Sequence, residues 1–181
     1  MFREFNLENL ENSKEILEKL LDKSRNEIDD LLKIENKTYK NFVLPFQEIG
    51  ENINNFLTPI FHIDSVKNSE ITTKVYEECI PLISKYETDI SQNEDIYISL
   101  KTIQSNENSS LNNIQNKVLE NEIRDFTLSG CHLEKKQKKR LEEISLRLSE
   151  LSHKFSQNLL NATNKFEMII DDFEDVKEIP N

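Results

Sequence analysis

The chain has 181 residues, of which 23 are Lys or Arg and 34 are Asp or Glu, so its formal net charge is −11 at pH 7. A charge of this sign repels phosphate backbones and anionic lipids, which makes nucleic acids and membranes poor candidates as partners. Leu, Ile, Val and Phe make up 56 residues, well above the roughly 20% below which a charged chain stays disordered. With only two glycines and four prolines, turn-forming residues are too few for a sheet of many hairpins. The composition therefore predicts an all-α protein.

The first half of the chain repeats apolar residues at steps of three, four and seven, which is typical of amphipathic helices. We expect three long helices here, over residues 9–34, over residues 39–57 and from residue 70 to a joint at 92–94, with a short helical turn at 59–66. Thr38 and Ser69 are the expected N-caps. Pro45 and Pro81 should bend their helices, and Thr58-Pro59 should end one, because a residue before proline disfavours the helical conformation.

The second half continues in the same way. A helix carrying Ile96 and Ile103 should be followed by a polar surface loop at residues 105–110. A further helix should run from Leu111 to about Ser129, with Gly130 in a left-handed position after its end. The longest helix is expected over residues 134–164, with an apolar stripe that packs in a bundle rather than in a two-stranded coiled coil.

These expectations combine into one architecture. We predict an elongated bundle of about five or six helices, in which residues 1–165 form a helical domain. Residues 166–181 change character, because apolar residues alternate from Phe166 to Ile170 before an acidic run. This segment is expected to be a short extended tail, the start of a strand or linker.

Few side chains are candidates for chemistry. A zinc peptidase of the common kind needs His-Glu-x-x-His on one helix, and this chain lacks that motif. Cys131 and His132 could supply two metal ligands, and Glu150 and His153 have a spacing that di-iron bundles use twice. The simpler interpretations are an exposed loop pair and a surface ion pair. We therefore predict no catalytic residue, no metal ligand and no cofactor in this chain, and we leave its binding residues unknown.

A basic run and the two cysteines bear on the partners and the cellular location of the chain. The basic run Lys135, Lys136, Lys138, Lys139 and Arg140 could be a nucleic-acid patch, but it opens an amphipathic helix and is more simply a solvated face. The two cysteines belong to no Cys-x-x-Cys pair, and no segment resembles an export signal or a membrane span. These observations predict reduced thiols in a cytoplasmic protein.

Two stretches carry a family resemblance. The first is Leu57-Thr-Pro-Ile-Phe-His-Ile-Asp-Ser-Val-Lys-Asn-Ser69, continuing through Tyr76, Pro81-Leu-Ile-Ser-Lys-Tyr86 and Gln92-Asn-Glu94 to Tyr97. The second is Arg124-Asp-Phe-Thr-Leu-Ser-Gly130, followed by Lys139-Arg140, Leu148-Ser-Glu-Leu151, Phe155-Ser-Gln-Asn158 and Asn161-Ala-Thr163. In order and spacing, these stretches resemble the N-terminal region of the thimet oligopeptidase and oligopeptidase A family of zinc metallopeptidases.

The resemblance implies a non-catalytic N-terminal helical domain that forms one wall of a channel for short peptides. It also implies a longer parent chain, whose downstream catalytic half holds zinc and is the partner of this domain. Residues His62 to Val66 are the candidates for contact with that half or with the channel, although a corner between two helices is the simpler interpretation. The alternative function is a free-standing helical protein-interaction module. Apolar surface left uncovered, particularly Phe166 to Ile170, predicts weak self-association.

Overall fold

The computed structural model describes residues 10–67, 69–172, 174 and 177, and in the last helix it describes only the backbone of residues 146, 149, 150, 153, 157, 160, 161 and 164. The chain divides into two compact units, Met1–His132 and Leu133–Asn181. All regular structure in the described part of the chain is helical, with no strand. The prediction of an all-α helical bundle is thereby confirmed.

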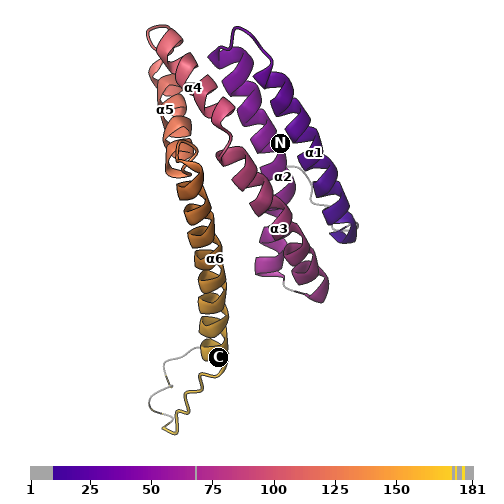
Figure 1. Cartoon of the computed structure of the whole chain (residues 1–181). Coiled ribbons are helices and arrows are strands. Elements are labelled where there is room, and N and C mark those ends of the chain that lie inside the picture. Colours follow the sequence, from indigo (N-terminus) through magenta and orange to yellow (C-terminus); the bar gives the residue numbers. More distant parts are fainter. Residues whose placement is uncertain (1–9, 68, 173, 175–176, 178–181) are drawn as a thin grey trace. The chain divides into compact units, whose positions relative to one another are not determined.

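Three long helices form the centre of the first unit, namely α1 (Ser13–Leu32), α2 (Leu44–Val66) and α3 (Glu70–Ser91). Each packs on the other two, and they run side by side in Figure 1. Two shorter helices, α4 (Glu94–Glu107) and α5 (Asn113–Leu128), form a pair of their own. A 3-10 turn, η1 (Leu10–Asn12), precedes α1, and a π-helical turn, η2 (Tyr39–Val43), precedes α2 and packs on α4.

One apolar core runs through this unit, and each of its five α-helices contributes to it. Its best-buried members include Phe42 from η2 and Cys79 from α3, neither of which has measurable exposure. The larger fully buried side chains are Phe42, Leu17, Ile96, Leu100, Ile103, Leu119 and Val43. Burying these residues supplies the main free energy that holds the helices together, at roughly 1.5–3 kcal/mol for a large side chain.

Helix ends follow the local sequence closely. Ser69 caps α3 with a reciprocal pair of bonds, in which the backbone N–H of Thr72 donates to Oγ of Ser69 at 3.2 Å and the backbone N–H of Ser69 donates to Oγ1 of Thr72 at 2.9 Å. Thr38 makes the same arrangement with Asn41 at the start of η2. Both predicted N-caps are confirmed, because a side-chain oxygen satisfies an amide that the helix leaves without a partner.

The end of α5 is also as predicted. Gly130 has a φ of 77°, in the left-handed region that favours glycine. Its N–H donates to the carbonyl of Thr127 at 3.0 Å, and the N–H of Cys131 donates to the carbonyl of Phe126 at 3.3 Å. These two bonds make a Schellman motif, and both Cys131 and Phe126 are buried.

The predicted boundary at Pro59 is wrong, because α2 continues through it to Val66. Proline removes one helical hydrogen bond but does not prevent a helix from continuing when packing holds both sides. Leu57 and Ile60, on either side of Pro59, are 4% and 5% exposed in the same core. Pro45 is better placed than predicted, since it lies in the first turn of α2, where an N–H has no helical partner in any case.

The region around residues 105–110 also differs from the prediction. Helix α4 runs on to Glu107, so only residues 108–112 connect it to α5. Asn112 caps α5 in a capping box with Gln115, which moves the start of that helix from Leu111 to Asn113. In this register Ile114 is 76% exposed, although the apolar period of the sequence predicts it on the inner face. Ile71 on α3 is likewise exposed rather than buried.

The second unit contains one long helix, α6 (Lys135–Asn164), whose bounds agree with the prediction. At 1.5 Å per residue it is about 45 Å long. Its apolar stripe, made of Ile144, Leu148, Leu151, Phe155 and Leu159, is 46–68% exposed. Residues 166–172 that follow have neither helical nor strand structure. The predicted packing of the stripe in a bundle, and the pairing of the tail as a strand, stay predictions.

Candidate functional site

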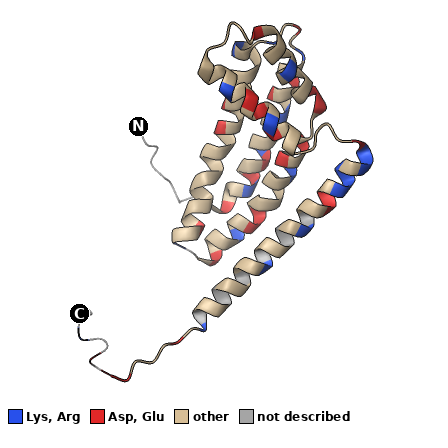
Figure 2. Cartoon of the chain, turned by 90° about the vertical axis from the view of Figure 1, so that its left-hand side faces the viewer, with Lys and Arg blue, Asp and Glu red and all other residues tan. Residues whose placement is uncertain are grey.

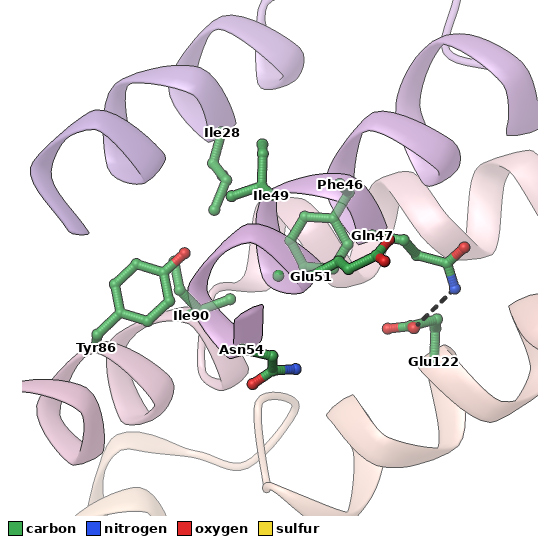
Figure 3. A pocket seen from close by; sticks show the side chains of 10 residues that line it. Ile28, Phe46, Gln47, Ile49, Glu51, Asn54, Tyr86, Ile90 and Glu122 are labelled. Carbon is green, nitrogen blue, oxygen red and sulfur yellow. Dashed lines mark hydrogen bonds between the residues drawn. The ribbon is translucent and has the colours of Figure 1, made fainter. Parts of the chain in front are cut away.

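A hollow of about 560 Å³ lies on one face of α2 in the first unit. Figure 3 shows α2 across the middle of the hollow, with Tyr86 and Ile90 on one side and Gln47 and Glu122 on the other. Four helices contribute to the lining, because α2 is bordered here by α1, α3 and α5. The lining residues are Ile28, Phe46, Gln47, Ile49, Gly50, Glu51, Asn54, Tyr86, Ile90 and Glu122.

Gly50 lies in the interior of α2 and lines this hollow. A glycine inside a helix costs about 0.5–1 kcal/mol of stability relative to alanine. Crowding does not explain it, since a Cβ built on Gly50 would meet no atom within 4 Å. Backbone conformation does not explain it either, because Gly130 is the glycine with positive φ. Gly50 therefore presents bare backbone to the hollow.

Glu122 on α5 is a charged residue of the hollow whose carboxyl has a raised pKa. Its side chain is half-buried, and burial raises the pKa of its carboxyl above the ordinary value, with Asp125 adding to the effect. Nε2 of Gln47 donates to Oε1 of Glu122 at 3.4 Å, a long bond that opposes the shift only in part. No Lys or Arg in the described part of the chain forms an ion pair with Glu122.

Tyr86 borders the opposite side of the hollow and is buried. Burial raises the pKa of its phenol, while a hydrogen bond with Ser24 and the guanidinium of Arg25 act against that shift. The Cζ atom of Arg25 lies 5.2 Å from the centre of the Tyr86 ring, and its Nη2 is 3.1 Å from Oδ2 of Asp89. The guanidinium at this edge is therefore already engaged outside the hollow.

The stretch His62 to Val66, named from the sequence, forms the end of α2. Oδ1 of Asp64 accepts hydrogen bonds from Oγ1 of Thr72 at 3.0 Å and from Oγ1 of Thr73 at 3.1 Å, both in the first turn of α3. Asp64 thus ties two helices together at a corner. His62 and Val66 are exposed, and nothing in the structure tests whether they contact another segment, so that role stays a prediction.

Of the two pairs considered as metal ligands, the structure describes the side chains of one, Cys131 and His132. Cys131 is fully buried, whereas its neighbour His132 is exposed. The side chains of Glu150 and His153 lie outside the described residues. Among the side chains that are described, no three of His, Cys, Asp or Glu converge in a way that could hold a metal ion. The donor set present in this part of the chain does not fit zinc.

Sequence reasoning did not find the hollow, because its lining comes from four helices far apart in the chain. One signal was available, namely the isolated Gly50 inside a helical pattern.

None of the described helices has the length and apolar character needed to span a membrane.

Comparison with known proteins gives consistent matches. Residues 17–138 match the family model described as the N-terminal domain of neurolysin and thimet oligopeptidase. The chain is 36% identical to oligopeptidase A of Haemophilus influenzae over 165 residues, which cover 91% of this chain and 24% of that protein.

Oligopeptidase A proteins of other organisms also match the chain. The chain is 34% identical to oligopeptidase A of Escherichia coli over 144 residues, 79% of this chain and 21% of that protein. It is 30% identical to the probable cytosolic oligopeptidase A of Arabidopsis thaliana over 162 residues, 89% of this chain and 23% of that protein. The chain therefore spans less than a quarter of the length of these relatives.

Proposed function

Because the chain belongs to the neurolysin and thimet oligopeptidase family, of which it matches the N-terminal domain, we propose that it is the non-catalytic helical domain of a zinc-dependent oligopeptidase. In this proposal it forms one wall of the channel that admits short peptides, and its partner is a downstream catalytic half. One observation supports the proposal best. The match covers most of this chain, but it covers less than a quarter of the length of each relative.

The sequence contains no His-Glu-x-x-His motif. In this proposal the metal and the water that it activates therefore belong to the downstream half. What this chain's own residues supply is a rigid surface. Core side chains such as Leu17 and Phe42 hold the helices in place, so that the exposed faces keep a fixed shape toward a substrate.

A chimera tests the proposal directly. Residues 1–164 of this chain would replace the matching segment of the Haemophilus influenzae relative, and kcat/KM would be measured on a set of short peptides together with zinc content. We expect a zinc-loaded enzyme whose kcat/KM values change from peptide to peptide, because the wall affects how substrates fit. The isolated chain should cleave none of them. A folded, zinc-loaded chimera with an unchanged peptide profile would contradict the channel-wall role.

The alternative, a free-standing interaction module, is favoured by one observation, the exposed apolar stripe of α6. Such a stripe is typical of a surface that another helix covers. If the chimera were folded but inactive while the isolated chain bound another protein through α6, this alternative would replace the first. We also propose a cytoplasmic location for this chain; one Arabidopsis thaliana relative is named as a probable cytosolic protein, whereas another is named as organellar.

A further inference from the structure

The charged side chains that line the hollow over Gly50 are all acidic. Its lining holds two carboxylates, Glu51 and Glu122, and contains no Lys, Arg or His. Asp125, one turn away from Glu122 on α5, lies outside the lining and is paired with Arg124, whose Nη2 is 3.1 Å from its Oδ1. At the opposite edge, Arg25 is paired with Asp89 and lies over the ring of Tyr86. An anion would therefore be repelled, whereas a cation would gain a partner that the lining does not supply.

The rest of the lining suits an apolar stem. Ile49 is buried, and Phe46 and Ile90 are half-buried, so each presents part of its surface beside the bare backbone of Gly50. A flexible aliphatic chain could lie along this surface without displacing any side chain, because the space above Gly50 is open. Covering apolar area of this kind removes it from water, which favours binding.

The polar groups of the hollow match a cation with several donors. Gln47 and Asn54 carry amide oxygens that can accept hydrogen bonds, beside the carboxylate of Glu122. An ammonium group has three donors and a guanidinium group has five. The volume of about 560 Å³ lies within the range of small-molecule sites, which is roughly 300–1,000 Å³.

We propose that this hollow binds an organic cation, a protonated amine or guanidinium carried on an aliphatic stem, with its charge against Glu122 and its stem over Gly50. The cation could belong to a free alkylamine or to the side chain of a Lys or Arg residue in a peptide. Both sources present the same chemistry to the hollow. The site accounts for a helical glycine that neither crowding nor positive φ explains, and for a half-buried carboxylate that has no ion pair among the described residues.

The half-buried position of Glu122 also favours tight pairing. Its carboxyl has already lost part of its hydration on folding, as its raised pKa indicates. A bound ammonium would therefore recover interaction energy without first having to strip water from a fully solvated anion.

The test is a titration of the full chain with small-molecule probes, in which two-dimensional amide NMR detects binding. The probes are n-butylammonium, N-acetyl-lysine-amide and, as the uncharged control, n-butanol. We expect both cations to shift amide signals of Gly50, Glu51 and Glu122, and we expect n-butanol to bind at least about tenfold more weakly. Tighter binding of the lysine amide would identify a peptide side chain as the ligand, and tighter binding of n-butylammonium would identify a free amine.

Three variants make the test decisive. Glu122→Gln keeps the shape of the side chain but removes its charge, and it should weaken cation binding about tenfold or more. Glu120→Gln removes a charge from the exposed face of the same helix and should change nothing. Gly50→Leu fills the hollow with a good helix former, so it should abolish binding while it leaves the thermal midpoint unchanged or higher.

The proposal is overturned if neither cation shifts the signals of the hollow at concentrations up to tens of millimolar. Equal affinity of n-butylammonium and n-butanol would overturn it as well, as would undiminished binding to folded Glu122→Gln. These outcomes are separate from the chimera experiment, because binding in the hollow does not depend on the presence of a catalytic half.

Discussion

The backbone N–H of Tyr39 donates a hydrogen bond of 2.6 Å to Oε2 of Glu107, a residue 68 positions later in the chain. This bond ties the start of the π-helical turn η2 to the last residue of α4. It also provides a partner for one of the amide groups that a helical N-terminus leaves without an internal bond. Two segments that are far apart in the sequence are thus joined by a charge-assisted contact.

Removing this carboxylate should destabilise the first unit. We expect Glu107→Ala to lower the free energy of unfolding by about 1.5–3 kcal/mol, the typical contribution of a hydrogen bond to a charged group. Glu107→Gln should lose less, because its amide oxygen can still accept. Urea unfolding followed by circular dichroism measures both. The control is Glu120→Ala, which removes an exposed ion pair with Lys117. It should change the free energy of unfolding by less than about 0.5 kcal/mol.

The two glycines should respond to alanine in opposite directions. Gly130→Ala places a Cβ on a residue with φ of 77°, so we expect a loss of about 1–2 kcal/mol. Gly50→Ala adds a methyl group in open space inside a helix, so we expect a gain of about 0.5–1 kcal/mol. Thermal unfolding of the two variants side by side gives the comparison. A loss of stability in both would mean that something in the chain already occupies the space above Gly50.

The corner between α2 and α3 allows a test of the stretch His62 to Val66. Asp64→Ala removes the acceptor for Thr72 and Thr73 and should cost about 1–3 kcal/mol of folding free energy. His62→Ala removes an exposed side chain and should leave stability within about 0.5 kcal/mol. If His62→Ala instead lowers peptide turnover in the chimera without a change in stability, the predicted contact role of this stretch gains direct support.

Glu122 should make stability depend on pH with a defined sign. Burial raises its pKa in the folded state above the ordinary value of 4.5, so the folded chain binds this proton more tightly than the unfolded chain. The neutral carboxyl therefore favours folding at low pH, and this contribution is lost as pH rises through the window that starts near 4.5 and extends upward to the raised pKa. We expect Glu122→Gln to be more stable than the parent at pH 7 and equal to it at about pH 4. A constant difference across this range would contradict the shift.

The exposed stripe of α6 predicts weak self-association. Sedimentation of the full chain at high concentration should show a reversible dimer, and higher salt should strengthen it by screening the acidic residues Asp171 and Asp172. Leu148→Lys should weaken association through the stripe, and deletion of residues 165–181 should weaken association through Phe166 to Ile170. A monomer at high concentration in both salts, unaffected by either change, would favour a self-sufficient domain.

Local features of the chain could be read from the sequence because their causes lie within a few residues. Thr38 and Ser69 cap their helices through side-chain oxygens three residues from the amides whose hydrogen bonds they accept, and Gly130 takes the left-handed conformation without the strain that a Cβ would add. The long amphipathic period of α6 predicted its bounds. The two stretches of family resemblance likewise depend on residue order alone, which is why the sequence was sufficient to identify the family.

Other features were decided only by the tertiary structure, because they depend on residues that are distant in the chain. Whether Pro59 ends a helix was decided by the burial of Leu57 and Ile60 against other helices, which outweighs one lost hydrogen bond. The bond between Tyr39 and Glu107 requires η2 and α4 to be packed in one particular way.

The hollow over Gly50 is a second feature of this kind. It lies where α1, α3 and α5 border α2 beside Gly50, and no pattern in a single helix contains that geometry. As Figure 2 shows, charged residues are distributed over all the helices of the first unit, so charge pattern alone could not have singled out Glu122. Its raised pKa and its place in the hollow arise from burial against other helices, which only the packed chain provides.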